Sequence, residues 1–159
     1  MPLAAPAQRV WSRSETIGLA DASCSLCHGY GMQPVAPGRE EVCPCVWRTI
    51  FRICLRRYQE CRTHPGYVRR SRKYQFSRPT EEYLADFERA TSNLSAAEAI
   101  VLRDHFLGKM PWFACARNLG MPRGAFFHFV NRLRTELGQR IATTAPYAIY
   151  PFAEYVQCN

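Results

Sequence analysis

The sequence predicts a mainly α-helical fold, in which a small cysteine-rich module and a basic helix precede a trihelical domain. Three observations support this prediction. Two close pairs of cysteines enclose a segment that is rich in glycine and proline. From Val46 to about Arg62, apolar residues recur at steps of three and four, which is the period of an amphipathic helix. Between Ser95 and Leu137, two glycines divide the sequence into three further helical segments.

The composition is that of a folded, basic protein. The chain has 159 residues, of which 47% are hydrophobic, and 21 lysines and arginines outnumber 13 acids to give a formal net charge of +8. Because cationic groups that meet phosphates release condensed counterions, this charge favours a nucleic-acid partner. No run of about 18 apolar residues is present, and residues 1–14 lack the apolar core of a signal peptide. We therefore expect a cytoplasmic protein with no membrane partner.

Changes in composition divide the chain into five segments. We expect a flexible arm over residues 1–20, a basic linker over 63–79 and an aromatic tail over 143–159. Between them lie the cysteine module with its basic helix (21–62) and a helical domain (80–142), whose first helix runs from about Thr80 to Asn93. The glycines and prolines of residues 21–45 predict loops in that segment, without helix or strand.

Cys24 and Cys27 form one cysteine pair, and Cys43 and Cys45 form the second. In a reducing compartment, eight cysteines favour metal ligation or burial over disulfides. Four thiolates in two pairs match the tetrahedral coordination of structural Zn²⁺, so we predict a zinc knuckle. The one-residue gap in the second pair leaves four substitutes for one ligand, namely His28, Cys54, Cys61 and His64. An iron-sulfur cluster is an alternative use of the same thiolates.

The first pair and the glycines that follow it, Cys-Ser-Leu-Cys-His-Gly-Tyr-Gly over residues 24–31, resemble a known type of zinc knuckle. Knuckles with this Cys-x-x-Cys-x-Gly-x-Gly pattern occur in chaperone zinc modules and in some phage antitermination proteins. The second pair departs from the commoner two-residue spacing.

The three helical segments after Asn93 have the signals of a helix-turn-helix. Ser95 and Glu98 have the spacing of a capping box, and Gly108 is expected to close the first helix in a left-handed conformation. The second helix should begin at Pro111, and its apolar residues are Trp112, Phe113, Cys115, Ala116 and Leu119. A close helix crossing needs a small residue and a turn with positive φ, which Ala116 and Gly120 supply.

Residues 94–137 resemble region 4 of bacterial sigma factors and related phage regulators. The resemblance rests on the Leu-Ser-x-x-Glu start and on Ala-Arg-Asn-Leu-Gly-Met-Pro-Arg over 116–123. It implies that residues 80–142 form a sigma region 4-like DNA-binding domain whose third helix, after Gly120, enters the major groove. Sigma proteins commonly have small or polar residues where this helix has Phe-Phe-His-Phe over 126–129.

The third helix is predicted to read bases with the side chains that face away from the helix corner, which are Arg123, Phe127, His128 and Asn131. Arginine pairs with guanine, asparagine with adenine, and an aromatic ring contacts the thymine methyl group. Phosphate contacts are expected from Arg48, Arg52, Arg56, Arg69, Arg70, Arg72, Lys73, Lys109, Arg132 and Arg134.

The segment from Val46 to Pro79 holds ten basic residues and one acid, so it carries much of the positive charge. Its charge does not distinguish DNA from RNA. No phosphate-binding glycine loop, zinc-protease motif or paired-carboxylate site is recognisable, so we do not expect an enzyme. Two functions follow as hypotheses. One is a sequence-specific DNA-binding transcription regulator that reads duplex DNA, and the other is a phage-type antitermination or late-gene factor that binds bacterial RNA polymerase. The sequence gives no indication of the oligomeric state.

Overall fold

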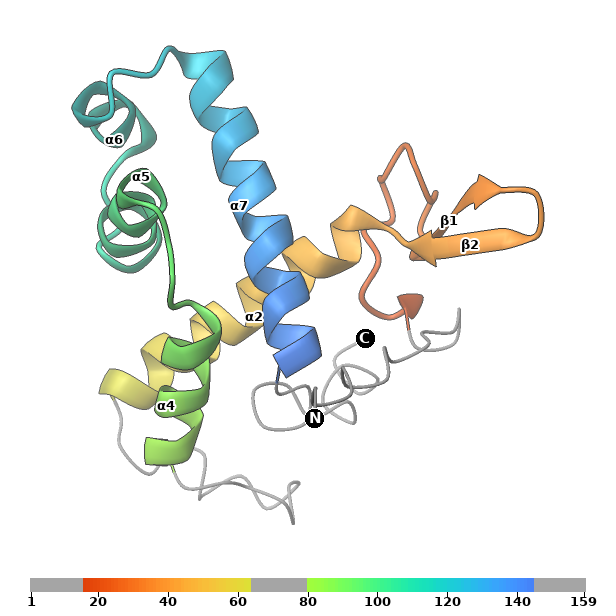
Figure 1. Cartoon of the computed structure of the whole chain (residues 1–159), viewed down its shortest axis with the longest axis horizontal. Helices are drawn as coiled ribbons and strands as arrows, with labels where there is room; N and C mark the ends of the chain where they lie inside the picture. Colours follow the sequence, from red (N-terminus) through yellow and green to blue (C-terminus); the bar gives the residue numbers. More distant parts are fainter. Residues whose placement is uncertain (1–15, 64–79, 145–159) are drawn as a thin grey trace, which may run out of the picture.

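The computed structural model describes residues 16–63 and 80–144, which form an assembly of helices with one small β-hairpin (Figure 1). The prediction of a mainly α-helical protein is confirmed. None of the helices in these two ranges is long and apolar enough to cross a membrane. The predicted arm up to residue 15, the linker from 64 and the tail from 145 lie outside the described residues. So do four predicted phosphate contacts and one alternative metal ligand, which are Arg69, Arg70, Arg72, Lys73 and His64.

The basic helix predicted from the sequence is α2, Pro44–Thr63. It begins directly after Cys43, with a proline at its first position, where the missing N–H costs no hydrogen bond. The face predicted to be apolar is the buried one, and its members include Val46, Trp47, Ile50, Phe51, Cys54, Tyr58 and Cys61. The sequence period therefore identified both the helix and its inner side.

The segment between the two cysteine pairs is a β-hairpin, so the prediction of loops without strands over residues 21–45 is wrong here. Strands β1 (Met32–Ala36) and β2 (Arg39–Val42) are antiparallel, and Gly38 has a φ of 71° in their turn. The amide of Cys43 donates to the carbonyl of Gly31, which extends the pairing to the cysteines (2.9 Å). The strands are short and mostly exposed, so they lack the long apolar alternation that identifies a strand in a sequence.

The second half contains α4 (Thr80–Ala90), α5 (Ala96–Ile100), a π-helical segment η1 (Val101–Leu107), α6 (Trp112–Asn118) and α7 (Arg123–Thr144). The capping box before α5 is present in both directions, because the Glu98 amide donates to Ser95 Oγ and the Ser95 amide donates to the Glu98 carboxylate. The third predicted helix begins where expected and extends seven residues past Leu137.

Gly108 does not close the first helix in the left-handed way that the sequence suggested. Its φ is −83°, and the left-handed residue is Lys109, with a φ of 55°. The amide of Gly108 donates to the carbonyl of Arg103 (2.9 Å), so the last turn is π-helical. A Cβ atom at residue 108 would lie 2.8 Å from the carbonyl oxygen of Asp104. Close approach of the backbone, rather than positive φ, therefore favours glycine at this position.

The corner between α6 and α7 has the two features predicted for it. Ala116 is buried against the neighbouring helices, and Gly120 has a φ of 64°. The amide of Met121 donates to the carbonyl of Ala116 (2.9 Å), which closes the turn.

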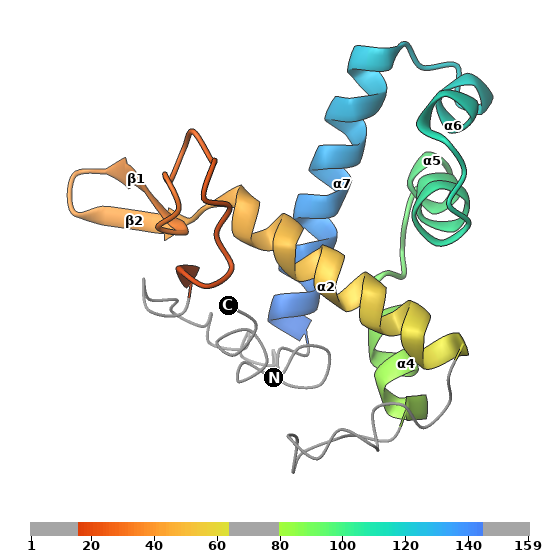
Figure 2. The same cartoon turned by 180° about the vertical axis from the view of Figure 1, so that it is seen from behind.

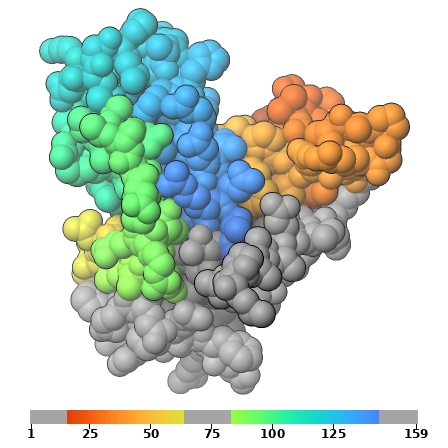
Figure 3. Space-filling view, viewed as in Figure 1, coloured from red at the N-terminus to blue at the C-terminus, as the bar shows by residue number. Residues whose placement is uncertain are grey.

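A single hydrophobic core joins the cysteine module to the later helices. Helix α7 crosses α2 and is flanked by α4, α5 and α6 on one side and by the hairpin module on the other (Figures 1, 2 and 3). Two ring contacts connect α2 with the later helices. Tyr58 stacks on Phe87 with ring centres 4.3 Å apart, and the ring centres of Phe51 and Phe106 are 5.1 Å apart. The basic helix therefore shares its core with the predicted helical domain.

The crossing of α2 and α7 depends on Gly138. A Cβ atom at this position would lie 1.9 Å from the carbonyl oxygen of Trp47, closer than any real contact allows. The two backbones therefore approach each other here without an intervening side chain.

We expect Gly138→Ala to destabilise the fold by about 1–3 kcal/mol, because the added methyl group forces the helices apart. Gly124→Ala is the matched control on the same helix, since a Cβ there meets no atom within 4 Å. The control should change the stability by less than about 0.5 kcal/mol, because Gly124 lies exposed in the first turn of α7. Urea unfolding of both variants measures the difference, and equal effects of the two substitutions would show that the crossing is not tight.

Candidate functional site

The four predicted cysteine ligands lie together in space. The sulfur atoms of Cys24 and Cys43 are 3.6 Å apart, as are those of Cys27 and Cys45, and all four lie within 4.8 Å of one another. Four thiolates about 2.3 Å from a tetrahedral metal ion are separated by about 3.8 Å, whereas a disulfide requires about 2.05 Å. The cluster therefore has the spacing of a metal site and could hold one ion.

Backbone amides point at the sulfur atoms. The amides of Cys27 and Leu26 donate to Cys24 Sγ, the amide of Cys45 donates to Cys43 Sγ, and the amide of Asp21 donates to Cys45 Sγ. Three residues with positive φ follow or flank the first pair, namely His28, Gly29 and Gly31. This left-handed backbone turns the chain tightly around the sulfurs, which is the local reason for the two glycines.

The electrostatics of the cluster fit a cation. The Cys27 amide lowers the pKa of the Cys24 thiol to about 7, against the opposing effect of burial. Burial raises the pKa values of Cys43 and Cys45 above the ordinary value of a thiol. A divalent ion at the centre would supply the positive charge that these buried sulfurs need to ionise.

The other thiols and the histidine proposed as substitute ligands lie elsewhere, within the ranges that the structure describes. His28 is exposed and is not part of the cluster. Cys54 and Cys61 are buried on the inner face of α2, and Cys115 is buried in α6, so they behave as small apolar side chains.

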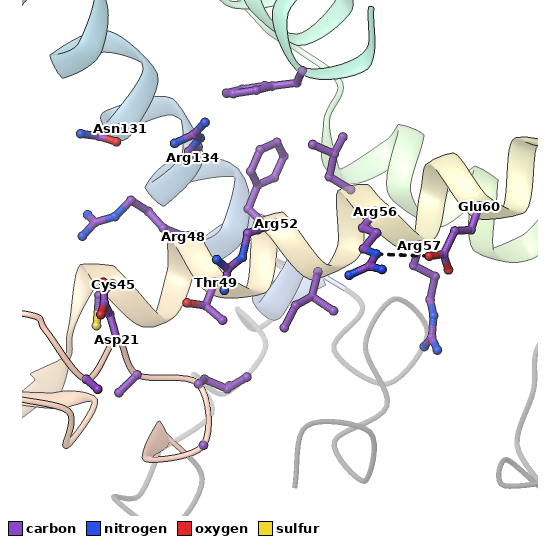
Figure 4. A pocket seen from close by; sticks show the side chains of 18 residues that line it. Asp21, Cys45, Arg48, Thr49, Arg52, Arg56, Arg57, Glu60, Asn131 and Arg134 are labelled. Carbon is purple, nitrogen blue, oxygen red and sulfur yellow. Dashed lines mark ion pairs between the residues drawn. The ribbon is translucent and has the colours of Figure 1, made fainter. Parts of the chain in front are cut away.

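A groove of about 950 Å³ lies between α2, residues 18–22 and α7 (Figure 4). Two acids, Asp21 and Glu60, line it together with five arginines and Asn131, and the arginines are Arg48, Arg52, Arg56, Arg57 and Arg134. The groove brings three predicted phosphate contacts of α2, Arg48, Arg52 and Arg56, close to two residues of α7. These two are the predicted base contact Asn131 and the predicted phosphate contact Arg134. We call this groove the arginine groove.

The positive charges of the arginine groove repel one another. Arg134 lies half-buried with its guanidinium 5.2 Å from the Phe106 ring centre, and burial, followed by the charges of Arg48 and Arg52, lowers its pKa. Among the described acids, none forms an ion pair with these three arginines. A bound anion would relieve this repulsion.

Asp21 connects the arginine groove to the cysteine cluster. Its carboxylate accepts hydrogen bonds from the Ser23 hydroxyl (2.7 Å) and amide (2.9 Å), and these bonds lower its pKa, with smaller contributions from Arg48 and Arg52. The amide of the same residue donates to Cys45 Sγ. One short loop thus forms a wall of the groove and part of the sulfur environment.

The four predicted base contacts all lie exposed on α7. The guanidinium of Arg123 lies 5.9 Å from the Phe127 ring centre and 5.6 Å from that of Trp112, whereas Asn131 lines the arginine groove. The remaining predicted phosphate contacts are less uniform. Lys109 is exposed, Arg132 pairs with Glu136 at 3.7 Å, and in the groove Arg56 pairs with Glu60 at 3.3 Å.

Sequence reasoning missed that Phe113 of α6 is exposed beside the half-buried Trp112. Phe113 is 52% exposed, and in this seven-residue helix only Cys115 and Ala116 are buried. Adjacent residues on a helix point about 100° apart, so Trp112 and Phe113 cannot both face one narrow contact. The adjacent Trp112 and Phe113 in a short helix were therefore a sequence signal that one of the two rings is exposed.

Comparisons of the chain with models of protein families, with curated proteins and with solved structures found no match.

The four-cysteine cluster predicts stoichiometric binding of one thiophilic divalent ion. The Cys43→Ser variant should lose this binding, because a serine hydroxyl does not ionise near neutral pH. Cys115→Ala is the matched control, since it removes a buried thiol outside the cluster and should keep one ion per chain. Metal analysis of the purified proteins checks both, and retention of one ion by Cys43→Ser would remove this cysteine from the ligand set.

Proposed function

We propose that the protein is a sequence-specific DNA-binding transcription regulator, in which α6 and α7 form a helix-turn-helix and the four cysteines hold a structural Zn²⁺ ion. One observation carries the proposal. The predicted base contact Asn131 and the predicted phosphate contacts of α2 line the same groove, although more than 70 residues separate them in sequence. A surface that combines amide and guanidinium donors in this way suits both base edges and phosphates.

Helix α7 supports this proposal through the spacing of four of its residues, of which Arg134 is half-buried and the other three are exposed. Arg123, Phe127, Asn131 and Arg134 follow one another at steps of four, four and three, so they form one stripe along the helix. At about 1.5 Å per residue the stripe is roughly 16 Å long. The major groove of DNA is about 12 Å wide and admits one helix, so a stripe of this length reaches several base pairs.

The corner between α6 and α7 supports a helix-turn-helix. The buried Ala116 lets the helices approach, and the left-handed Gly120 turns the chain. The first turns of α7 follow this corner, with Arg123 and Phe127 exposed. In helix-turn-helix proteins the N-terminal residues of the second helix of the motif contact base edges.

Zinc is the metal that the donor set favours, because four thiolates in a closed tetrahedral arrangement are typical of structural zinc sites. Bound there, the ion would hold the hairpin module folded. Cys43 and Cys45 lie at the start of α2, so the ligands would also fix the end of the helix that carries Arg48 and Arg52.

A second function, binding to bacterial RNA polymerase as an antitermination or late-gene factor, is favoured by one observation. The exposed rings of Phe113 and Phe127 both contact the half-buried Trp112 on α6, and exposed aromatic rings are common in protein interfaces.

Selection of binding sites from a random duplex library tests the first function. The wild-type protein should enrich one motif, and Arg123→Ala combined with Asn131→Ala should lose it, because each side chain offers a bidentate contact to a base. Tyr30→Ala, an exposed aromatic change in the hairpin module, serves as control. Binding without enrichment by the wild type would favour the polymerase-bound factor.

The arginine groove predicts a steep dependence of DNA affinity on salt. Each neutralised phosphate contributes a slope of about −0.9 in a plot of log K against log salt. The double substitution Arg48→Ala and Arg52→Ala should therefore make the slope shallower by about 2, measured by fluorescence anisotropy between 50 and 200 mM salt. Arg39→Ala, in the hairpin, should leave the slope unchanged. An unaltered slope in the double variant would exclude the groove from phosphate binding.

A further inference from the structure

Three aromatic rings from two helices meet at the outer corner of α6 and α7. The ring centres of Trp112 and Phe127 are 5.3 Å apart, and those of Trp112 and Phe113 are 6.1 Å apart at an interplanar angle of 88°. Phe113 is 52% exposed and Phe127 is 39% exposed. We call these three residues the aromatic cluster. Large apolar rings held together at a surface indicate a binding site.

The charge around the aromatic cluster is positive. The Arg123 guanidinium lies within 6 Å of the Trp112 and Phe127 ring centres, and Arg117 is exposed one turn after Phe113 on α6. His128, beside Phe127, is also exposed. This rim favours a polyanion over a basic protein surface. Rings combined with arginine are the groups that stack on nucleobases.

The aromatic cluster is continuous with the arginine groove. Phe127, Asn131 and Arg134 lie on one stripe of α7, and the last two line the groove. Seven residues separate Phe127 from Arg134, a distance of about 10 Å along the helix axis, or roughly three steps of a stacked strand. A single strand with one base at the cluster can therefore place its next phosphates in the groove.

We propose that the aromatic cluster stacks on an unpaired nucleobase, so that the preferred ligand is duplex DNA that also contains a locally unpaired segment, rather than a fully closed duplex. This inference rests on the proposed DNA binding and names its substrate class. In a closed duplex, neighbouring base pairs cover the faces of each base. Only an unpaired or unstacked base offers a face to Phe113 and Phe127.

Fluorescence anisotropy with two ligands tests the proposal: a 30-base-pair duplex, and the same duplex with four central mismatched pairs. The metal-loaded full chain should bind the mismatched duplex about 10-fold more tightly, within the range of one stacked base. Phe113→Ala and Phe127→Ala should bring this ratio close to one, whereas Phe127→Tyr should keep it. Tyr30→Ala is the control for loss of an exposed ring elsewhere, and circular dichroism verifies that each variant is folded.

Equal or tighter binding of the closed duplex by the wild type would overturn the proposal. So would a preference for the mismatched duplex that survives both alanine substitutions, since the rings would then not be its source. Loss of polymerase binding in these variants with unchanged DNA ratios would assign the cluster to a protein partner. Failure of the underlying function looks different, because the protein would then bind neither DNA.

Discussion

The backbone contact between Gly138 and Trp47 is the constraint on which the rest of the structure depends. It lets α7 cross α2 at a distance that no side chain would permit, and the core then fills on both sides with rings such as Phe51 and Phe106. The same crossing brings the arginines of α2 beside Arg134 of α7. Without this crossing, the arginines of α2 and the residues of α7 would not line one groove.

The cysteine cluster fixes the N-terminal end of α2, the helix that carries most of the groove arginines. Cys43 and Cys45 lie at the start of α2, and the amide of Asp21 donates a hydrogen bond to Cys45 Sγ. The position of Arg48 therefore depends both on the helix crossing at Gly138 and on the sulfur cluster at the start of α2. A helix fixed at two points holds its outer charges in a defined geometry, which lowers the entropic cost of binding an anion there.

The parts predicted from the sequence were those with local signals. The period of α2, the capping box at Ser95 and the left-handed Gly120 each depend on residues a few positions apart. The four cysteines were also identifiable as a possible metal site, because two close cysteine pairs are a common spacing of metal ligands. The hairpin was missed because its strands carry little apolar pattern. The arginine groove was missed because it joins α2 to α7, and no local pattern encodes the Gly138 crossing that brings them together.

The loop at Asp21 has a thermodynamic consequence. Its amide contacts a sulfur of the cysteine cluster, and its carboxylate is within electrostatic reach of two groove arginines. A metal ion in the cluster and an anion in the groove would then share one structural element, through which binding at one site would change the free energy of binding at the other. By reciprocity, any factor by which the metal changes the affinity for the anion is also the factor by which the anion changes the affinity for the metal. Under this coupling, a chain with an anion in the groove would hold its metal with a different affinity from a chain whose groove is empty.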